Sequence, residues 1–189
     1  MTAIKLRHLA AAILCIVAWA IPLAAKTSSS QVCVEKNCYP RVATIAEKEV
    51  PLRGAALLRF WGFHIYTAGY YEGNRSADAP PSRKLVLNYL RTITKKDIVR
   101  ATEKGIEKNP DANRAELAER LDLLYSAYVD VRKGDSYEIV YTPGTGTAVS
   151  FNGTLKVTIP GDDFADAFIG IWVSEHALSQ SLRDKLTSG

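Results

Sequence analysis

The stretch Leu57–Glu72 (LLRFWGFHIYTAGYYE) brings several side chains that can bind or polarise a ligand close together along the chain. Arg59 can hold a carboxylate or an oxyanion through paired, charge-assisted hydrogen bonds. His64 and Tyr66 are two residues apart, so in an extended strand they project to the same face, and Tyr70 follows further along that face. These four side chains could form the polar corner of a cleft.

Plainer structural roles account for the same residues. Arg59 can cover apolar surface with its stem while its charged head reaches solvent. The aromatic residues can form a half-buried strand face, since aromatic side chains are common on strands. The residue types alone leave both interpretations open.

The cysteines indicate a local disulfide. Cys33 and Cys38 lie in VCVEKNCYP, whereas Cys15 falls in an apolar N-terminal segment. Two cysteines in an exported chain indicate a disulfide, because oxidising compartments preserve such bonds. Closing so short a loop would stabilise the fold by about 1–3 kcal/mol. His64 and His176 do not lie at ligand spacing from either cysteine, so we expect no metal site and no cofactor.

The N-terminus has the layout of a secretory signal peptide. A basic start at Lys5 and Arg7 leads into the apolar run Leu9–Ile21, which ends in small residues before Lys26. This layout predicts that residues 1–25 are removed on export. The alternative is an uncleaved inner-membrane anchor, but the run is shorter than the roughly 20 residues that a spanning helix needs. We therefore expect a periplasmic or secreted protein with no membrane association after cleavage.

The charge balance does not indicate a nucleic-acid partner. The 189-residue chain has 24 Lys and Arg against 20 Asp and Glu, and removal of Lys5 and Arg7 lowers the basic count to 22. Basic residues such as Arg75, Lys84 and Arg100 are mixed with acids, so no stripe of one sign is present. The length fits one domain with a sizeable core.

Apolar and aromatic residues alternate along several segments, which predicts β-strands. Asn152-Gly153 is the strongest signal for a tight hairpin turn between two of them. The expected strands are Glu47–Phe60, Phe63–Glu72, Lys84–Arg91, Tyr137–Tyr141, Thr147–Phe151 and Thr154–Ile159.

Capping residues and helical spacing predict four helices. Thr94 caps the first, Lys95–Lys108, and the second, Ala115–Val131, carries leucines and tyrosines at three- and four-residue spacing. Two short helices follow at Asp163–Val173 and Ser179–Leu186. Strands, two helices, more strands and terminal helices predict an α+β domain with helices against one sheet face.

Three stretches resemble the chalcone isomerase family, in particular its bacterial chalcone isomerase-like branch. They are Leu57–Glu72, the hairpin Thr145–Pro160 (TGTAVSFNGTLKVTIP) and Ala167–Leu186 (AFIGIWVSEHALSQSLRDKL). The resemblance implies an open-faced sandwich: a large antiparallel sheet, helices layered on one face and a ligand cleft between them. We expect residues 26–45 to be a lead-in that holds the disulfide and residues 46–189 to form this domain.

The polar catalytic positions of the plant enzymes are mostly replaced in this chain. Their arginine, which polarises the reacting oxygen, is matched best by Arg59, while an ungapped alignment on the neighbouring glycine gives Leu58. Chalcone cyclisation needs donors aimed at developing charge, and the other matched positions supply few of them. Tyr66 takes the place of the strand threonine and Ile98 that of the helical tyrosine. Gly105 takes the place of the helical asparagine, and Ile171 that of the threonine or serine in the terminal helix.

The leading hypothesis is a non-catalytic periplasmic protein whose cleft binds a small apolar molecule or a fatty acid, the ligand that part of the family implies. An isomerase or intramolecular lyase that uses Arg59, Tyr66 and His64 on a substrate other than chalcone is the first alternative. A protein-interaction module of the envelope is the second. The residues expected to line the cleft are Arg59, Tyr66, Tyr70, Ile98 and Ile171.

Export can be tested on the mature N-terminus. N-terminal sequencing of the exported protein should begin near Lys26, and Cys33 and Cys38 should resist alkylation until a reductant is added. A membrane-embedded product that begins at Met1 would contradict cleavage. Free thiols in the exported protein would contradict the disulfide.

Overall fold

The computed structural model describes residues 31–77 and 79–189. The predicted signal peptide, residues 1–25, lies outside this part of the chain. Among the described residues, no helix is long and apolar enough to cross a membrane.

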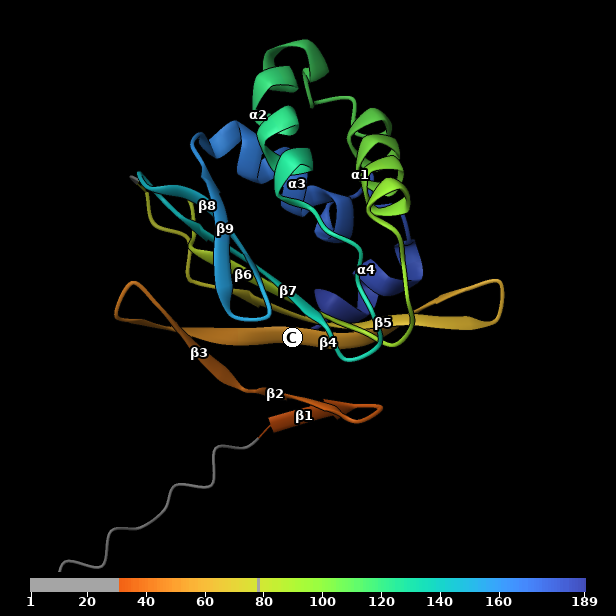
Figure 1. The fold of residues 1–189 in the computed structure, drawn as a ribbon. Helices are drawn as coiled ribbons and strands as arrows, with labels where there is room; N and C mark the ends of the chain where they lie inside the picture. The colour runs from red at the N-terminus through yellow and green to blue at the C-terminus, as the bar shows by residue number, and fades with distance from the viewer. Residues whose placement is uncertain (1–30, 78) are drawn as a thin grey trace, which may run out of the picture.

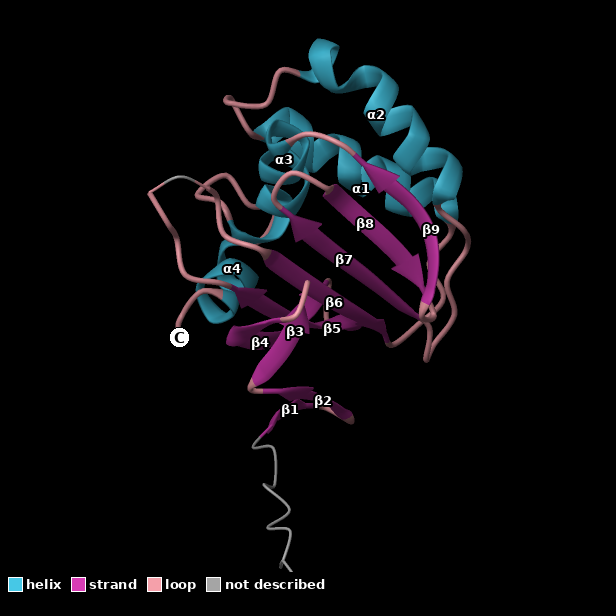
Figure 2. Cartoon of the chain, turned by 90° about the vertical axis from the view of Figure 1, so that its left-hand side faces the viewer, coloured by secondary structure: helices cyan, strands magenta, loops and turns pink. Residues whose placement is uncertain are grey.

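Seven antiparallel strands form one sheet in which every strand pairs with its neighbours in the sequence (Figures 1 and 2). Alternating side chains give the sheet two distinct faces, as the strand Arg83–Tyr89 shows. Leu85, Leu87 and Tyr89 belong to the core under the helices, whereas Val86 packs in the cluster on the other face. The strands are β3 (Val42–Ile45), β4 (Lys48–Phe60), β5 (Phe63–Glu72), β6 (Arg83–Tyr89), β7 (Ser136–Thr142), β8 (Gly146–Phe151) and β9 (Thr154–Ile159).

The helices gather on one face of this sheet (Figure 2). Between β6 and β7 the chain forms α1 (Lys95–Lys108) and α2 (Arg114–Ala127), and after β9 it forms α3 (Asp162–Val173) and α4 (Gln180–Leu186). The α+β open-faced arrangement predicted from the sequence is therefore confirmed. The second helix is shorter than the predicted Ala115–Val131, because the chain turns extended at Tyr128.

Helix α3 is fixed at its N-terminal end by two ion pairs. Arg83 of β6, whose side chain is buried, donates to Asp166 Oδ1 at 2.7 Å. Arg120 of α2 holds both carboxylate oxygens of Asp163, at 2.7 and 2.6 Å, and these hydrogen bonds lower the Asp163 pKa. Acidic residues in a first helical turn are also favoured by the helix dipole. These charged contacts tie one end of α3 to β6 and α2, while its apolar residues, among them Phe164 and Phe168, are buried in the core.

The opposite face of the sheet carries a two-stranded hairpin, β1 (Gln31–Val34) and β2 (Asn37–Pro40), visible below the sheet in Figure 1. The predicted Cys33–Cys38 disulfide is present and joins two directly paired residues. The expected lead-in at 26–45 thus contains strands, and the sheet begins at Val42, ahead of the expected boundary at residue 46. The turns that follow β1 and β3 contain neither glycine nor proline. Glu35, Ala46 and Glu47 adopt the positive φ angles instead, so the usual residue signals of a turn are missing there.

The hairpin is attached to the sheet through Tyr39, which is 2% exposed. Its hydroxyl donates to Thr67 Oγ1 at 2.7 Å and accepts from Asn88 Nδ2 at 2.9 Å. Asn37 Nδ2 donates to the same Thr67 oxygen at 2.8 Å. Gly69 lets the Tyr39 ring lie flat on β5, because a Cβ there would collide with the ring. A small polar network therefore joins β2 to β5 and β6.

Replacing Tyr39 by Phe should lower the free energy of unfolding by about 1–3 kcal/mol, because it leaves buried polar groups without their partner. Tyr71→Phe is the matched control: Tyr71 lies in the same cluster, and its hydroxyl has no hydrogen bond within the described residues. The control should change stability by less than about 0.5 kcal/mol. Equal changes in chemical denaturation of the two variants would contradict the proposed attachment.

Candidate functional site

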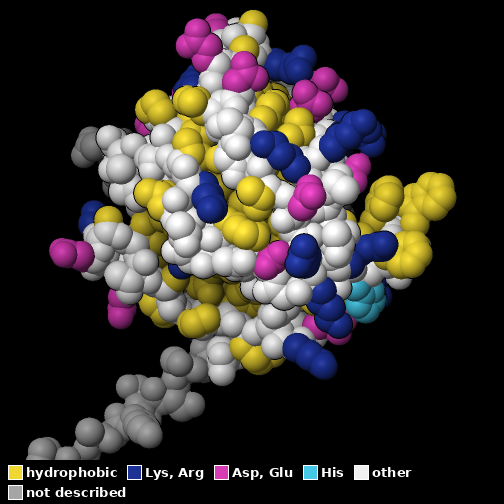
Figure 3. All heavy atoms as spheres, viewed as in Figure 1, with side chains coloured by type: hydrophobic (Ala, Val, Ile, Leu, Met, Phe, Trp, Pro, Cys, Tyr) yellow, Lys and Arg dark blue, Asp and Glu magenta, His cyan; other side chains and the backbone are white. Residues whose placement is uncertain are grey.

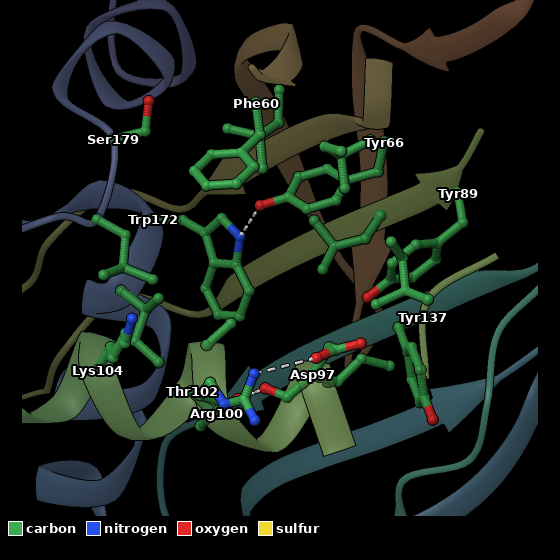
Figure 4. Close-up of a pocket in the computed structure, with 18 of the residues that line it drawn as sticks. Phe60, Tyr66, Tyr89, Asp97, Arg100, Thr102, Lys104, Tyr137, Trp172 and Ser179 are labelled. Carbon is green, nitrogen blue, oxygen red and sulfur yellow. Dashed lines mark hydrogen bonds and ion pairs between the residues drawn. The ribbon is translucent and has the colours of Figure 1, made fainter. Parts of the chain in front are cut away.

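A cavity of about 490 Å³ lies between the sheet and the helices α1, α3 and α4 (Figure 4). This volume falls within the range of about 300–1,000 Å³ that is usual for small-molecule sites. The walls are almost entirely apolar. Aliphatic side chains line it from both layers: Leu58, Leu87, Ile139 and Val149 from the sheet, and Ile98, Ile171 and Leu182 from the helices.

A row of tyrosines forms part of the cavity wall. The Tyr66 and Tyr89 rings meet edge to face, with 5.7 Å between their centroids. The centroid of the Tyr137 ring lies 6.2 Å from that of Tyr89 and 5.6 Å from that of Tyr128. Burial raises the pKa of Tyr66 and of Tyr89 well above the ordinary tyrosine value. These phenols therefore remain neutral and can donate hydrogen bonds inside an apolar space.

Most polar atoms of the wall already have partners. Trp172 Nε1 donates to the Tyr66 hydroxyl at 2.8 Å, as drawn in Figure 4. Thr102 Oγ1 donates to the Ile98 carbonyl at 3.0 Å and lies 3.2 Å from the Tyr128 hydroxyl. The Tyr89 hydroxyl, by contrast, has no hydrogen-bond partner in the described part of the chain. The interior thus offers apolar surface and very few vacant polar groups.

Charged side chains are confined to the opening of the cavity. Asp97, Arg100 and Lys104 of α1 line it and are exposed to solvent, as is Phe60 at the end of β4. Arg100 Nη1 lies 3.4 Å from Asp97 Oδ1, whereas Lys104 has no ion-pair partner among the described residues. The opening is therefore positively charged at Lys104.

Three residues predicted for the cleft do line the cavity: Tyr66, Ile98 and Ile171. Gly105 lies directly behind Ile171, since a Cβ at Gly105 would be 2.7 Å from two side-chain carbons of Ile171. Tyr70 is buried in the core and is not part of the lining. The absence of a side chain at Gly105 is thus what lets α1 approach α3 closely.

Arg59 does not line the cavity. It is exposed, and its neighbours Leu58 and Phe60 line the cavity instead. Because side chains alternate along a strand, Arg59 projects from the other face of β4. Leu58, the residue that the ungapped alignment sets against the arginine, lines the cavity.

His64 is also outside the cavity, and a β-bulge is the reason. The pairing of β4 with β5 shifts at this point, so that Ile65 is an extra residue on β5. The bulge cancels the same-face relation that the two-residue spacing of His64 and Tyr66 predicted. His64 Nδ1 instead lies 3.2 Å from Glu35 Oε1 in the turn of the β1–β2 hairpin. The expected row of Arg59, His64 and Tyr66 is not assembled.

Several lining residues were not expected from the sequence. Tyr89 and Tyr137 could have been found, because each continues the alternation of inward apolar residues along its strand. Trp172 and the α1 cations could not, since their place depends on how α1 and α3 lie over the sheet. The unexpected polar and aromatic lining residues are Phe60, Tyr89, Asp97, Arg100, Thr102, Lys104, Tyr128, Tyr137, Trp172 and Ser179.

A family model described as chalcone isomerase-like matches residues 32–187, and the chain therefore belongs to the chalcone isomerase-like family. Among solved structures, the chain is similar to a fatty-acid binding protein of Arabidopsis thaliana, with a TM-score of 0.64 and 12% sequence identity over 84% of this chain and 96% of that one. At this identity the likeness shows the fold alone. A comparison with curated protein sequences gives no match.

The contact between Gly105 and Ile171 can be tested by a double-mutant cycle. Gly105→Ala should destabilise the protein, because overpacking costs about 1–3 kcal/mol and outweighs the roughly 1 kcal/mol that alanine gains over glycine within a helix. In an Ile171→Ala background the collision is absent, so the same change should be stabilising. A Gly105→Ala effect of the same sign and size in both backgrounds, measured by chemical denaturation, would contradict the contact.

Proposed function

We propose that this protein binds one elongated apolar molecule with an acidic end, such as a fatty acid, without transforming it. The observation that carries the proposal is the cavity of about 490 Å³ with its apolar walls between sheet and helices. Burying an alkyl chain there would contribute about 0.8 kcal/mol for each methylene removed from water. Membership of the chalcone isomerase-like family and the likeness to a plant fatty-acid binding protein support this function.

The acidic end of the ligand is placed at the opening. A carboxylate deep in the cavity would lose its hydration without meeting a cation, at a large cost in free energy. At the opening it would meet Lys104, with Arg100 one helical turn away. Lys104 thus takes the role that the sequence suggested for Arg59.

A catalytic role has weaker support. The isomerase alternative relied on Arg59, Tyr66 and His64, and only Tyr66 lines the cavity. Its hydroxyl accepts a hydrogen bond from Trp172, and its raised pKa keeps it protonated. It therefore makes a poor base at neutral pH.

An exported location remains part of the proposal. The disulfide between Cys33 and Cys38 supports an oxidising compartment, and the N-terminal layout predicts a cleaved signal. We place the protein in the periplasm, where a carrier would shield an apolar acid from water.

Calorimetric titration with a long-chain fatty acid and the matching fatty alcohol tests the proposal. Lys104→Ala should weaken binding of the acid by about 1 kcal/mol, the upper range for an exposed ion pair, and should leave binding of the alcohol unchanged. Lys96→Ala, an exposed lysine on the same helix that does not line the cavity, is the matched control and should alter neither affinity.

Fluorescence locates the ligand independently. In the chain that begins near Lys26, a Trp61→Phe variant keeps only Trp172, whose ring lines the cavity. Its emission should change as fatty acid is added. Binding without any change in Trp172 emission would place the ligand elsewhere, and no binding of either the acid or the alcohol would refute the proposed function.

A further inference from the structure

The hairpin that joins β4 to β5 ends in three exposed aromatic side chains. Phe60 is 64% exposed, Trp61 88% and Phe63 59%. Figure 3 shows hydrophobic side chains projecting at the right, where this hairpin extends beyond the sheet in Figure 1. We call Phe60, Trp61 and Phe63 the aromatic tip.

The fold gains little from the aromatic tip. Trp61 and Gly62 have φ angles of 50° and 81°, as in the two-residue turns that favour Asn-Gly. A bulky residue is strained in this region of backbone space. Within the described residues, the only aromatic ring that packs near Trp61 is that of Phe60, with 6.1 Å between the ring centroids. Tryptophan at this position therefore costs stability without filling a core, which indicates a partner outside the chain.

The charges around the aromatic tip are mainly basic. The Arg91 guanidinium lies 4.6 Å from the centre of the Phe63 ring, and Arg59 is exposed on the hairpin itself. Lys104 and Arg100 line the same cavity as Phe60.

The acidic groups in this region already have cationic or ionisable partners. Asp97 pairs with Arg100 and Glu35 lies against His64. An anionic surface would therefore complement the charge of this region.

We propose that the aromatic tip enters the interfacial layer of an anionic lipid bilayer and holds the cavity opening against it. Tryptophan and other aromatic side chains favour this layer, and neighbouring arginines and lysines are attracted to acidic headgroups. Phe60 belongs both to the tip and to the cavity lining, so docking places the opening at the lipid surface. This proposal differs from the sequence-based expectation of no membrane association. The docking itself does not depend on the proposed function; only a passage of ligand between the bilayer and the cavity would rest on it.

Flotation of the exported protein with vesicles tests the docking. Vesicles that contain phosphatidylglycerol should bind the wild type, whereas pure phosphatidylcholine vesicles should bind it more weakly. Trp61→Asn should lower vesicle binding at least about tenfold while its melting temperature stays equal or rises, because asparagine suits the turn. Replacing Arg59 and Arg91 by Gln should lower binding to anionic vesicles by about fivefold for each charge.

Leu155→Asn is the matched control, since it removes an exposed apolar side chain from β9, the opposite edge strand, and it should float like the wild type. In a Trp172→Phe variant, brominated lipids should quench the emission of Trp61. Equal flotation of wild type and Trp61→Asn would overturn the proposal, as would a dimer that dissociates on this substitution, because a second copy would then cover the tip.

The two proposals can fail separately. Trp61→Asn should keep the wild-type affinity for fatty acid in vesicle-free solution. Wild-type flotation without fatty-acid binding would refute the ligand and leave the docking; fatty-acid binding without flotation would refute the docking alone.

Discussion

The charged anchoring of α3 is the constraint on which the cavity depends. Arg83 and Arg120 hold Asp166 and Asp163 at the N-terminal end of this helix, while its far end carries Trp172 in the cavity wall. Because the Arg83 side chain is buried, loss of Asp166 would leave a desolvated charge, which is far costlier than loss of a surface pair. The other end of α3 packs against α1 where Gly105 meets Ile171, and Ile171 and Trp172 line the cavity there.

The cavity separates two kinds of surface. Its walls are aliphatic and aromatic, burial raises the pKa of the Tyr66 phenol above its ordinary value, and its cations lie only at the opening. Such a division favours a molecule with one long apolar part and one acidic end, since the apolar part would meet the apolar walls and the acidic end the cations at the opening. Leu58, Ile98 and Ile171, which the sequence comparison set against polar positions of the plant enzymes, contribute only apolar surface to this lining.

The long, periodic elements were predictable from the sequence, and the side-chain directions near irregularities were not. Phe63–Glu72 and Lys95–Lys108 were predicted with the bounds that the structure gives, because alternation and a clear N-cap define them. The bulge at Ile65 has no signal in a single sequence, yet it decides which face His64 occupies. The first three strands were missed because four-residue strands joined without glycine turns resemble a polar lead-in.

The attachment of the N-terminal hairpin has a consequence for the order of folding. The hairpin emerges first during synthesis and can form its own short-range disulfide early, but its docking partners Thr67 and Asn88 lie on strands made later. Contacts that close long loops form late, because their entropy must be lost first. We therefore expect the sheet to assemble before Tyr39 docks beneath it. The hairpin would then dock only on a sheet in which β5 and β6 are already paired. A chain arrested before this step would expose the outer face of β5 and β6.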